Sequence, residues 1–137
     1  MKTVFADTLY WVATARPLDS WKSAANRARR DLGPAMLITT DEVLTEFLAA
    51  MSRGGAECRR RASRTVRAIL ASPSVRVLPQ SRDTFLRALH RYERREDKSY
   101  SLTDCRSMDV MDAEGITEVL TNDHHFQQEG YTTLMRK

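Results

Sequence analysis

The chain has 137 residues, enough for one domain with a single sizeable core. Hydrophobic residues make up 42% of it, and neither an apolar run of bilayer length nor a signal-like apolar core is present, so we expect a cytoplasmic protein without a membrane segment. The two cysteines form no CxxC pair, which argues against a thiolate zinc site, and the net charge of +4 favours a polyanionic partner.

Short apolar segments alternate with helical segments from the start of the chain. Residues 3–7 are a β-prone run that ends in an acid, and a helix is expected over 20–31, before Gly33. Residues 35–39 are a second strand candidate, and a helix is expected over 42–52.

The alternation continues in the second half of the chain. Further helices are expected over 56–71, 82–96 and 103–114, and further strands over 75–79, 117–121 and 131–135. Short apolar strands separated by helices are typical of a parallel sheet that is covered on both faces. The sequence therefore predicts a single α/β domain, residues 1–137, with a mainly parallel five-stranded sheet.

Acidic residues fall where the predicted strands end. Asp7 closes the first strand, Asp123 follows the fourth, and Asp104 stands at the head of a helix. Glu46 lies in the helix after the second strand. Because sites in open parallel sheets form outside the carboxyl ends of the strands, these four acids are candidates for one site.

Helical periodicity separates Glu46 from its neighbour Glu42. Glu42 points almost opposite the apolar stripe of its helix and suits a capping box with Thr39, which is a structural role. Glu46 lies on the flank of the stripe, where a side chain can line a cleft.

Asp104 shares one helix face with Met108 and Met111. It therefore heads the partly buried side of its helix. A cap that serves only the solvent-exposed helix end need not lie on that side.

Each acid also has a purely structural interpretation. Asp7 could cap the next helix, Asp104 could cap its own, and Asp123 could begin an Asx-turn. Four carboxylates at one sheet edge would, however, repel one another unless a cation neutralises them. Their hard oxygen ligands suit Mg²⁺ or Mn²⁺.

The same acids lie in four stretches that resemble the PIN-domain ribonucleases, and specifically the VapC-like toxins of bacterial toxin–antitoxin pairs. The stretches are VFADTLYWVA (4–13), TTDEVLTEFLA (39–49), DKSYSLTDCRSMDVM (97–111) and ITEVLTNDHHFQQEGY (116–131). They run in family order over nearly the whole chain, and the last two together are the most specific.

The resemblance implies a three-layer α/β/α sandwich and assigns roles to single residues. By resemblance, the metal is held by the quartet of Asp7, Glu46, Asp104 and Asp123. Thr8 and Thr103 match positions that support the site, and Asp97 is expected next to the ligands. Family members often carry serine at the position of Leu9 and arginine at that of His124, which puts substrate detail in doubt.

The implied activity is Mg²⁺- or Mn²⁺-dependent hydrolysis of RNA phosphodiester bonds by the toxin of a toxin–antitoxin pair. We expect Asp7 and Asp123 to bind the metal directly, and Asp104 and Glu46 to orient the attacking water. The implied partners are RNA, a cognate antitoxin and a second copy of the chain in a homodimer.

Three alternatives remain open at this point. The chain could be a PIN nuclease of RNA processing, or a catalytically silent PIN-fold module that binds RNA or protein. Loss of a quartet acid would favour the silent module, and none is missing. A phosphatase with an aspartyl nucleophile would need a second acid at the position of Leu9.

A basic segment, residues 53–67, contains six arginines and one acid. Arg59, Arg60, Arg61 and Arg64 could follow RNA phosphates or bind an acidic antitoxin segment, and a solvated helix face is the alternative. His124 and His125 could contact phosphate, but the favoured prediction for both is a surface turn.

Overall fold

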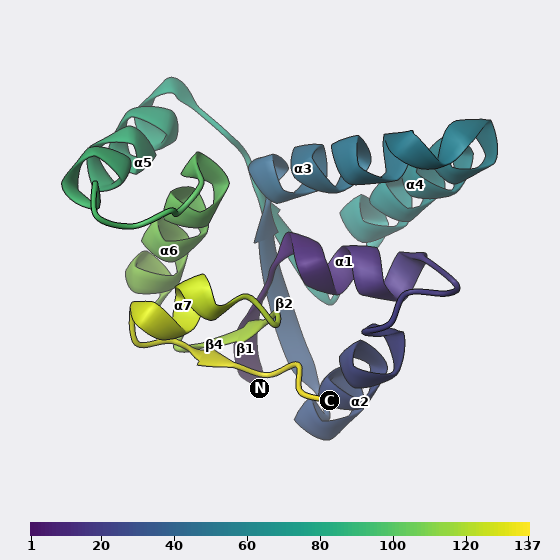
Figure 1. Cartoon of the computed structure of the whole chain (residues 1–137). Helices are drawn as coiled ribbons and strands as arrows, with labels where there is room; N and C mark the ends of the chain where they lie inside the picture. Colours follow the sequence, from purple (N-terminus) through teal and green to yellow (C-terminus); the bar gives the residue numbers. More distant parts are fainter.

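Short apolar runs form the strands of a central sheet in the computed structural model, which describes all 137 residues (Figure 1). The strands are β1 (Lys2–Ala6), β2 (Ala35–Thr40), β3 (Val75–Leu78), β4 (Glu118–Leu120) and β5 (Thr132–Thr133). All pairings are parallel, in the order β3-β2-β1-β4-β5. The expected five-stranded sheet is confirmed.

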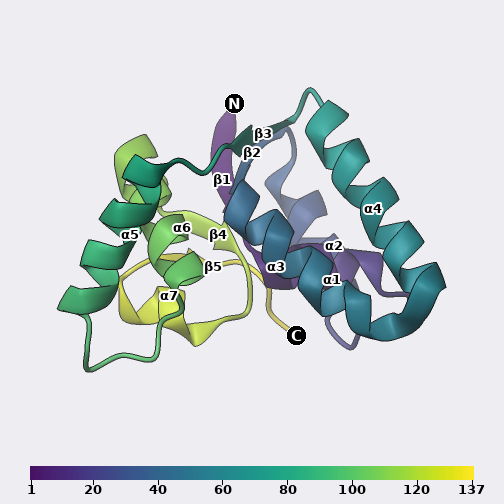
Figure 2. The ribbon, with the colours of Figure 1, turned by 90° about the horizontal axis from the view of Figure 1, so that it is seen from above.

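Helices cover both faces of this sheet and complete a three-layer α/β/α sandwich (Figures 1 and 2). One layer holds α1 (Thr8–Ala15), α2 (Lys22–Leu32), α3 (Asp41–Met51), the 3-10 turn η1 (Ser52–Gly54) and α4 (Gly55–Ala71). The other layer holds α5 (Arg82–Arg94), α6 (Leu102–Glu114) and α7 (His124–Gln128). None of the helices combines the length and the apolar character needed to cross a bilayer.

The direction in which the chain adds strands reverses between β1 and β4. From β1 the chain moves outward to β2 and β3, and it then returns to the other side of β1 as β4. Connections leave β1 and β4 on opposite faces, so their carboxyl ends mark the switch point at which ligand sites form in open parallel sheets. Asp7 directly follows β1, and Thr121 directly follows β4.

The start of α3 differs from the sequence prediction. Thr40 is the N-cap, and its hydroxyl accepts a hydrogen bond from the Val43 amide at 3.1 Å. The predicted capping box of Thr39 with Glu42 is wrong, because the third helical position is then the apolar Val43. Glu42 instead pairs with Arg106 of α6 at 3.2 Å, which ties α3 to α6.

Candidate active site

Asp7 lies at the junction of β1 and α1 and is almost completely buried. It occupies the N-cap position of α1, yet its side chain makes no capping hydrogen bond. The Thr121 hydroxyl donates to Asp7 Oδ2 at 2.9 Å. Burial raises the pKa of Asp7 from 3.8 to about 7; the Thr121 hydrogen bond opposes the rise, and the charges of Asp104 and Glu46 add to it. The charges of Asp104 and Glu46 therefore act on the Asp7 carboxyl.

Asp104 stands in the first turn of α6, where it both caps the helix and faces the site. Its Oδ2 accepts a hydrogen bond from the Ser101 amide at 3.1 Å, while the Ser101 hydroxyl accepts one from the Asp104 amide at 3.0 Å. Burial raises the pKa of Asp104, the bonds from Ser101 and His125 oppose the rise, and the charge of Asp123 adds to it. Capping alone does not require burial at this position.

Asp123 is joined to Asp7 through a single hydroxyl group. The Asp123 amide donates to Thr121 Oγ1 at 3.1 Å, and the same hydroxyl donates to Asp7. Asp123 is also the N-cap of α7, because its Oδ1 accepts a hydrogen bond from the His125 amide at 2.9 Å. Thr121 therefore fixes the acid after β1 relative to the acid after β4.

Glu46 completes the group from α3 and is half-buried. Its charge acts on Asp7, and α3 packs against α6, which carries Asp104. The structure thus brings the four predicted acids together at the carboxyl edge of the sheet. Their roles as metal ligands stay a prediction.

The structure places the three predicted supporting residues in different surroundings. Thr8 is buried beside Asp7, and its hydroxyl has no partner within the protein. Thr103 lines a small cavity with Glu42 and Arg106. Asp97 is exposed and lies 3.6 Å from the Lys98 ammonium group, so the structure does not place it among the acids.

His125, for which the sequence analysis favoured a surface turn, contacts two of the acids. Its Nδ1 lies 3.1 Å from Asp104 Oδ2 and 3.4 Å from Asp123 Oδ1, and its Nε2 lies 3.2 Å from Ser99 Oγ. The predicted surface turn is therefore wrong for His125, which lies in α7 and packs edge-on against Tyr100. The side chain of His124 is exposed as predicted, but the predicted turn is wrong for this residue too, because His124 begins α7.

The chemistry of the acid cluster fits a divalent cation. No lysine or arginine pairs with any of the four carboxylates, and His125 is the one basic group that contacts both Asp104 and Asp123 within 3.5 Å. Burial and mutual repulsion raise the pKa values of Asp7 and Asp104. A cation would relieve this repulsion, and carboxylate oxygens suit Mg²⁺ or Mn²⁺.

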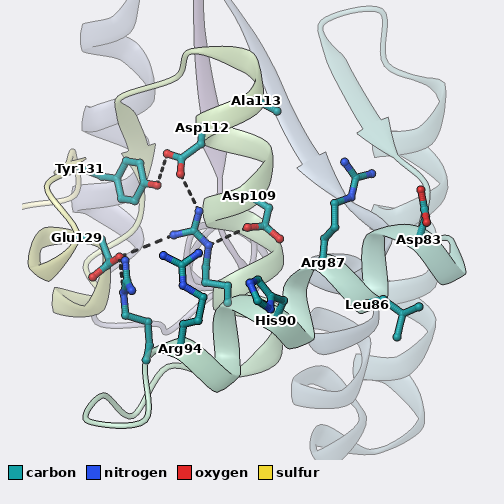
Figure 3. Close-up of a pocket in the computed structure, with 12 residues that line it drawn as sticks. Asp83, Leu86, Arg87, His90, Arg94, Asp109, Asp112, Ala113, Glu129 and Tyr131 are labelled. Atoms are coloured by element: carbon teal, nitrogen blue, oxygen red, sulfur yellow. Dashed lines mark hydrogen bonds and ion pairs between the residues drawn. The ribbon is translucent and has the colours of Figure 1, made fainter.

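A cavity of about 950 Å³ lies elsewhere, between α5, α6 and the α7–β5 turn (Figure 3). None of the four acids lines it. Its central cation, Arg91, contacts Asp109 at 2.7 Å, Asp112 at 2.6 Å and Glu129 at 3.7 Å. These paired charges join three elements, which makes this cluster a structural clamp.

The predicted basic residues lie on α4, away from this cavity. Arg60 and Arg64 share Glu57 at 2.8 and 3.7 Å, and Arg59 donates to the Ser52 hydroxyl at 2.9 Å. Arg59, Arg60 and Arg64 are exposed, and Arg61 is half-buried. The contacts within α4 and η1 are therefore weak surface contacts.

The sheet order and the acid cluster define a class of nuclease-like α/β proteins. The chain belongs to the PIN domain family, because the model of that family matches residues 4–129. The chain is 29% identical over 131 residues to the 23S rRNA-specific endonuclease VapC20 of two Mycobacterium tuberculosis strains, CDC 1551 / Oshkosh and H37Rv. That match covers 96% of this chain and 97% of the relative.

Solved structures show the same likeness. The crystal structure of Mycobacterium tuberculosis VapC20, a sarcin-ricin loop cleaving toxin, superposes with a TM-score of 0.86 at 26% identity and covers 97% of this chain and 99% of that one. FitAcB from Neisseria gonorrhoeae has a TM-score of 0.63 at 13% identity over 96% of both chains, which supports the fold alone.

Proposed function

We propose that this protein is a metal-dependent endoribonuclease that hydrolyses RNA phosphodiester bonds and serves as the toxin of a toxin–antitoxin pair. The observation that carries the proposal is the convergence of Asp7, Glu46, Asp104 and Asp123 at the carboxyl ends of β1 and β4, without an arginine or lysine to neutralise them. The likeness to VapC20 over nearly the full length of both chains supports the same activity.

Mg²⁺ or Mn²⁺ would supply two things when bound: a lowered pKa for water and positive charge next to the scissile phosphate. Asp7 and Asp123 are the proposed direct ligands. The Thr121 hydroxyl, which bonds to both residues, holds them in register. Asp104 and Glu46, on opposite helix layers, orient the attacking water and accept its proton.

The remaining parts of the proposal concern substrate and partners. VapC20 is named for 23S rRNA and for the sarcin-ricin loop, so an RNA with that loop is the first substrate to test. A cognate antitoxin, a homodimer and a cytoplasmic location complete the proposal. The exposed arginines of α4 offer a surface for RNA phosphates or for an acidic antitoxin segment.

Cleavage of RNA is expected to require a divalent cation. The purified protein is expected to cut a sarcin-ricin loop RNA with Mg²⁺ or Mn²⁺ and to stop in EDTA, which gel analysis of end-labelled RNA measures. Asp104→Asn is expected to cut RNA more than about a hundredfold more slowly than the parent. Replacing a residue that only supports the metal ligands already costs about tenfold to a hundredfold in metal affinity or activity. Asparagine keeps the capping shape, so loss of the cap does not explain a slow variant. Cleavage that persists in EDTA would contradict the metal mechanism.

Replacement of Arg59, Arg60 and Arg61 by alanine is expected to weaken RNA or antitoxin binding and to flatten its salt dependence. Each lost contact to single-stranded RNA lowers the slope of log K against log salt by about 0.7, so three contacts give about 2. Fluorescence anisotropy at several salt concentrations measures the slope. The control replaces Arg27, Arg29 and Arg30 of α2, a separate helix that leads into β2. Equal slopes in the parent and both variants would show that the basic segment, residues 53–67, is only a solvated helix face.

A further inference from the structure

One ion pair joins the two helix layers of the sandwich. Arg106 Nε of α6 donates to Glu42 Oε2 of α3 at 3.2 Å, and both side chains are largely buried, with 9% and 14% exposed. No other ion pair links a helix on one face of the sheet to a helix on the other. Because water and salt screen a buried pair less than a surface pair, its geometry is held more firmly.

Arg106 also contacts the loop that follows β3. Its Nη2 donates to the Pro79 carbonyl oxygen at 3.3 Å, and the next amide along the loop, that of Gln80, donates to Asp41 Oδ2 at 3.1 Å. The planar guanidinium directs its N–H groups in fixed directions, so two acceptors fix its orientation. The first turn of α3 is thus held against α6 and against the β3–α5 loop.

Each end of the Arg106–Glu42 pair lies close in sequence to an acid of the quartet. Glu42 precedes Glu46 by four residues on α3, and Arg106 follows Asp104 by two residues on α6. At a rise of about 1.5 Å per residue, these separations are about 6 Å and about 3 Å along the helix axes. Because a helix behaves as a rigid element over one turn, a change in the helix separation at the pair also displaces Glu46 relative to Asp104.

Thr121 fixes only two of the four acids relative to one another. Its hydroxyl bonds to Asp7 and to the Asp123 amide. No hydroxyl or amide connects Glu46 to Asp104 in this way. Their separation therefore depends on how α3 packs against α6, the two helices that the buried ion pair joins.

We propose that Arg106 is a positioning residue of this nuclease, which acts through Glu42 to set the separation of Glu46 from Asp104. The inference rests on the proposed function, because the quartet is what the pair positions. A buried ion pair adds little net stability, since the cost of desolvation offsets the attraction, and its best-attested role is to specify one geometry. A displacement of about 1 Å in a catalytic site can cost about a hundredfold in rate.

The test replaces the pair by neutral side chains of similar size, in Glu42→Gln/Arg106→Met. One charge of each sign is lost, so the net charge stays the same. The matched control, Asp109→Asn/Arg91→Met, neutralises the ion pair between α6 and α5 in the same way, and α5 carries none of the four acids. Calorimetry measures Mn²⁺ affinity, urea unfolding measures stability, and RNA cleavage at saturating Mn²⁺ gives kcat and KM.

Glu42→Gln/Arg106→Met is expected to bind Mn²⁺ about tenfold or more weakly and to have a lower kcat. KM for RNA is expected to change little, because the buried pair does not contact the substrate. The control is expected to lose stability and to keep the Mn²⁺ affinity and kcat of the parent. Arg106→Lys keeps the charge but lacks the directed N–H groups, so it is expected to lie between the parent and the double variant, and it carries the test if the double variant does not fold.

A Glu46→Gln background separates positioning from a general loss of structure. In that background, loss of the Arg106–Glu42 pair is expected to reduce Mn²⁺ affinity less than in the parent, since the pair acts through Glu46. Equal reductions in both backgrounds, an unchanged affinity in the double variant, or an equal loss in the control would overturn the role of Arg106 and leave the proposed function intact. A parent that binds no divalent ion and cuts no RNA would overturn both.

Discussion

Replacement of Asp7 by asparagine is expected to abolish RNA cleavage and, at pH 8 without metal, to stabilise the fold. Asp7 is 3% exposed and has a pKa of about 7, because burial and the charges of Asp104 and Glu46 disfavour its carboxylate. Asparagine has nearly the same shape and can still accept the Thr121 hydrogen bond. It removes the charge that a metal ligand needs and that burial disfavours when no metal is bound.

The sign of the pH dependence follows from the raised pKa. In the unfolded chain the Asp7 carboxyl loses its proton near pH 4, whereas in the folded protein it keeps the proton up to about pH 7. Its contribution to stability is therefore fully present below about pH 4 and is lost as the pH rises to about 7. A difference of about 3 pKa units corresponds to about 4 kcal/mol, an upper bound for the gain in the variant at pH 8.

Urea unfolding in EDTA at pH 4 and at pH 8 measures this effect. The advantage of Asp7→Asn over the parent is expected at pH 8 and is expected to disappear at pH 4. Asp97→Asn provides the control, because Asp97 is exposed and outside the acid cluster. An advantage of equal size at both pH values would mean that charge is not its cause.

Much of the fold can be predicted because the buried strands are short apolar runs. The two helices that were not predicted show the limit of periodicity. In α1 the consecutive residues Tyr10, Trp11, Val12 and Ala13 are all buried, so the helix has no polar face to reveal its period. The five residues of α7 span little more than one turn, too short for any pattern.

The candidate site was predictable where it depends on topology and unpredictable where it depends on distant packing. Asp7 and Asp123 follow neighbouring parallel strands, so their proximity follows from the strand ends. The partner of Glu42 is Arg106, which is 64 residues away, and no local pattern identifies it. His125 reaches the acids because Ser99 and Tyr100, on a separate loop, hold its ring.

Replacement of Arg91 by alanine is expected to cost about 2 to 4 kcal/mol of unfolding free energy, the range for breaking half-buried charge clusters. The Arg91 side chain is 17% exposed and contacts Asp109 and Asp112 of α6 and Glu129 of the α7–β5 turn. Its removal leaves Glu129, which is 13% exposed, with Arg95 at 3.2 Å as its remaining cationic partner. It also leaves Asp109, 23% exposed, with no cationic partner.

Arg94→Ala is the matched control for this change. Arg94 lies on the same helix and lines the same cavity, yet it forms no ion pair, so its loss is expected to cost less than about 0.5 kcal/mol (Figure 3). Both variants lose one positive charge, and urea unfolding at pH 7 compares them directly. Equal stability of the two variants would show that net charge, rather than the Arg91 clamp, sets the effect. A cost confined to Arg91→Ala would locate the stability of the α5–α6 layer in these three carboxylate contacts.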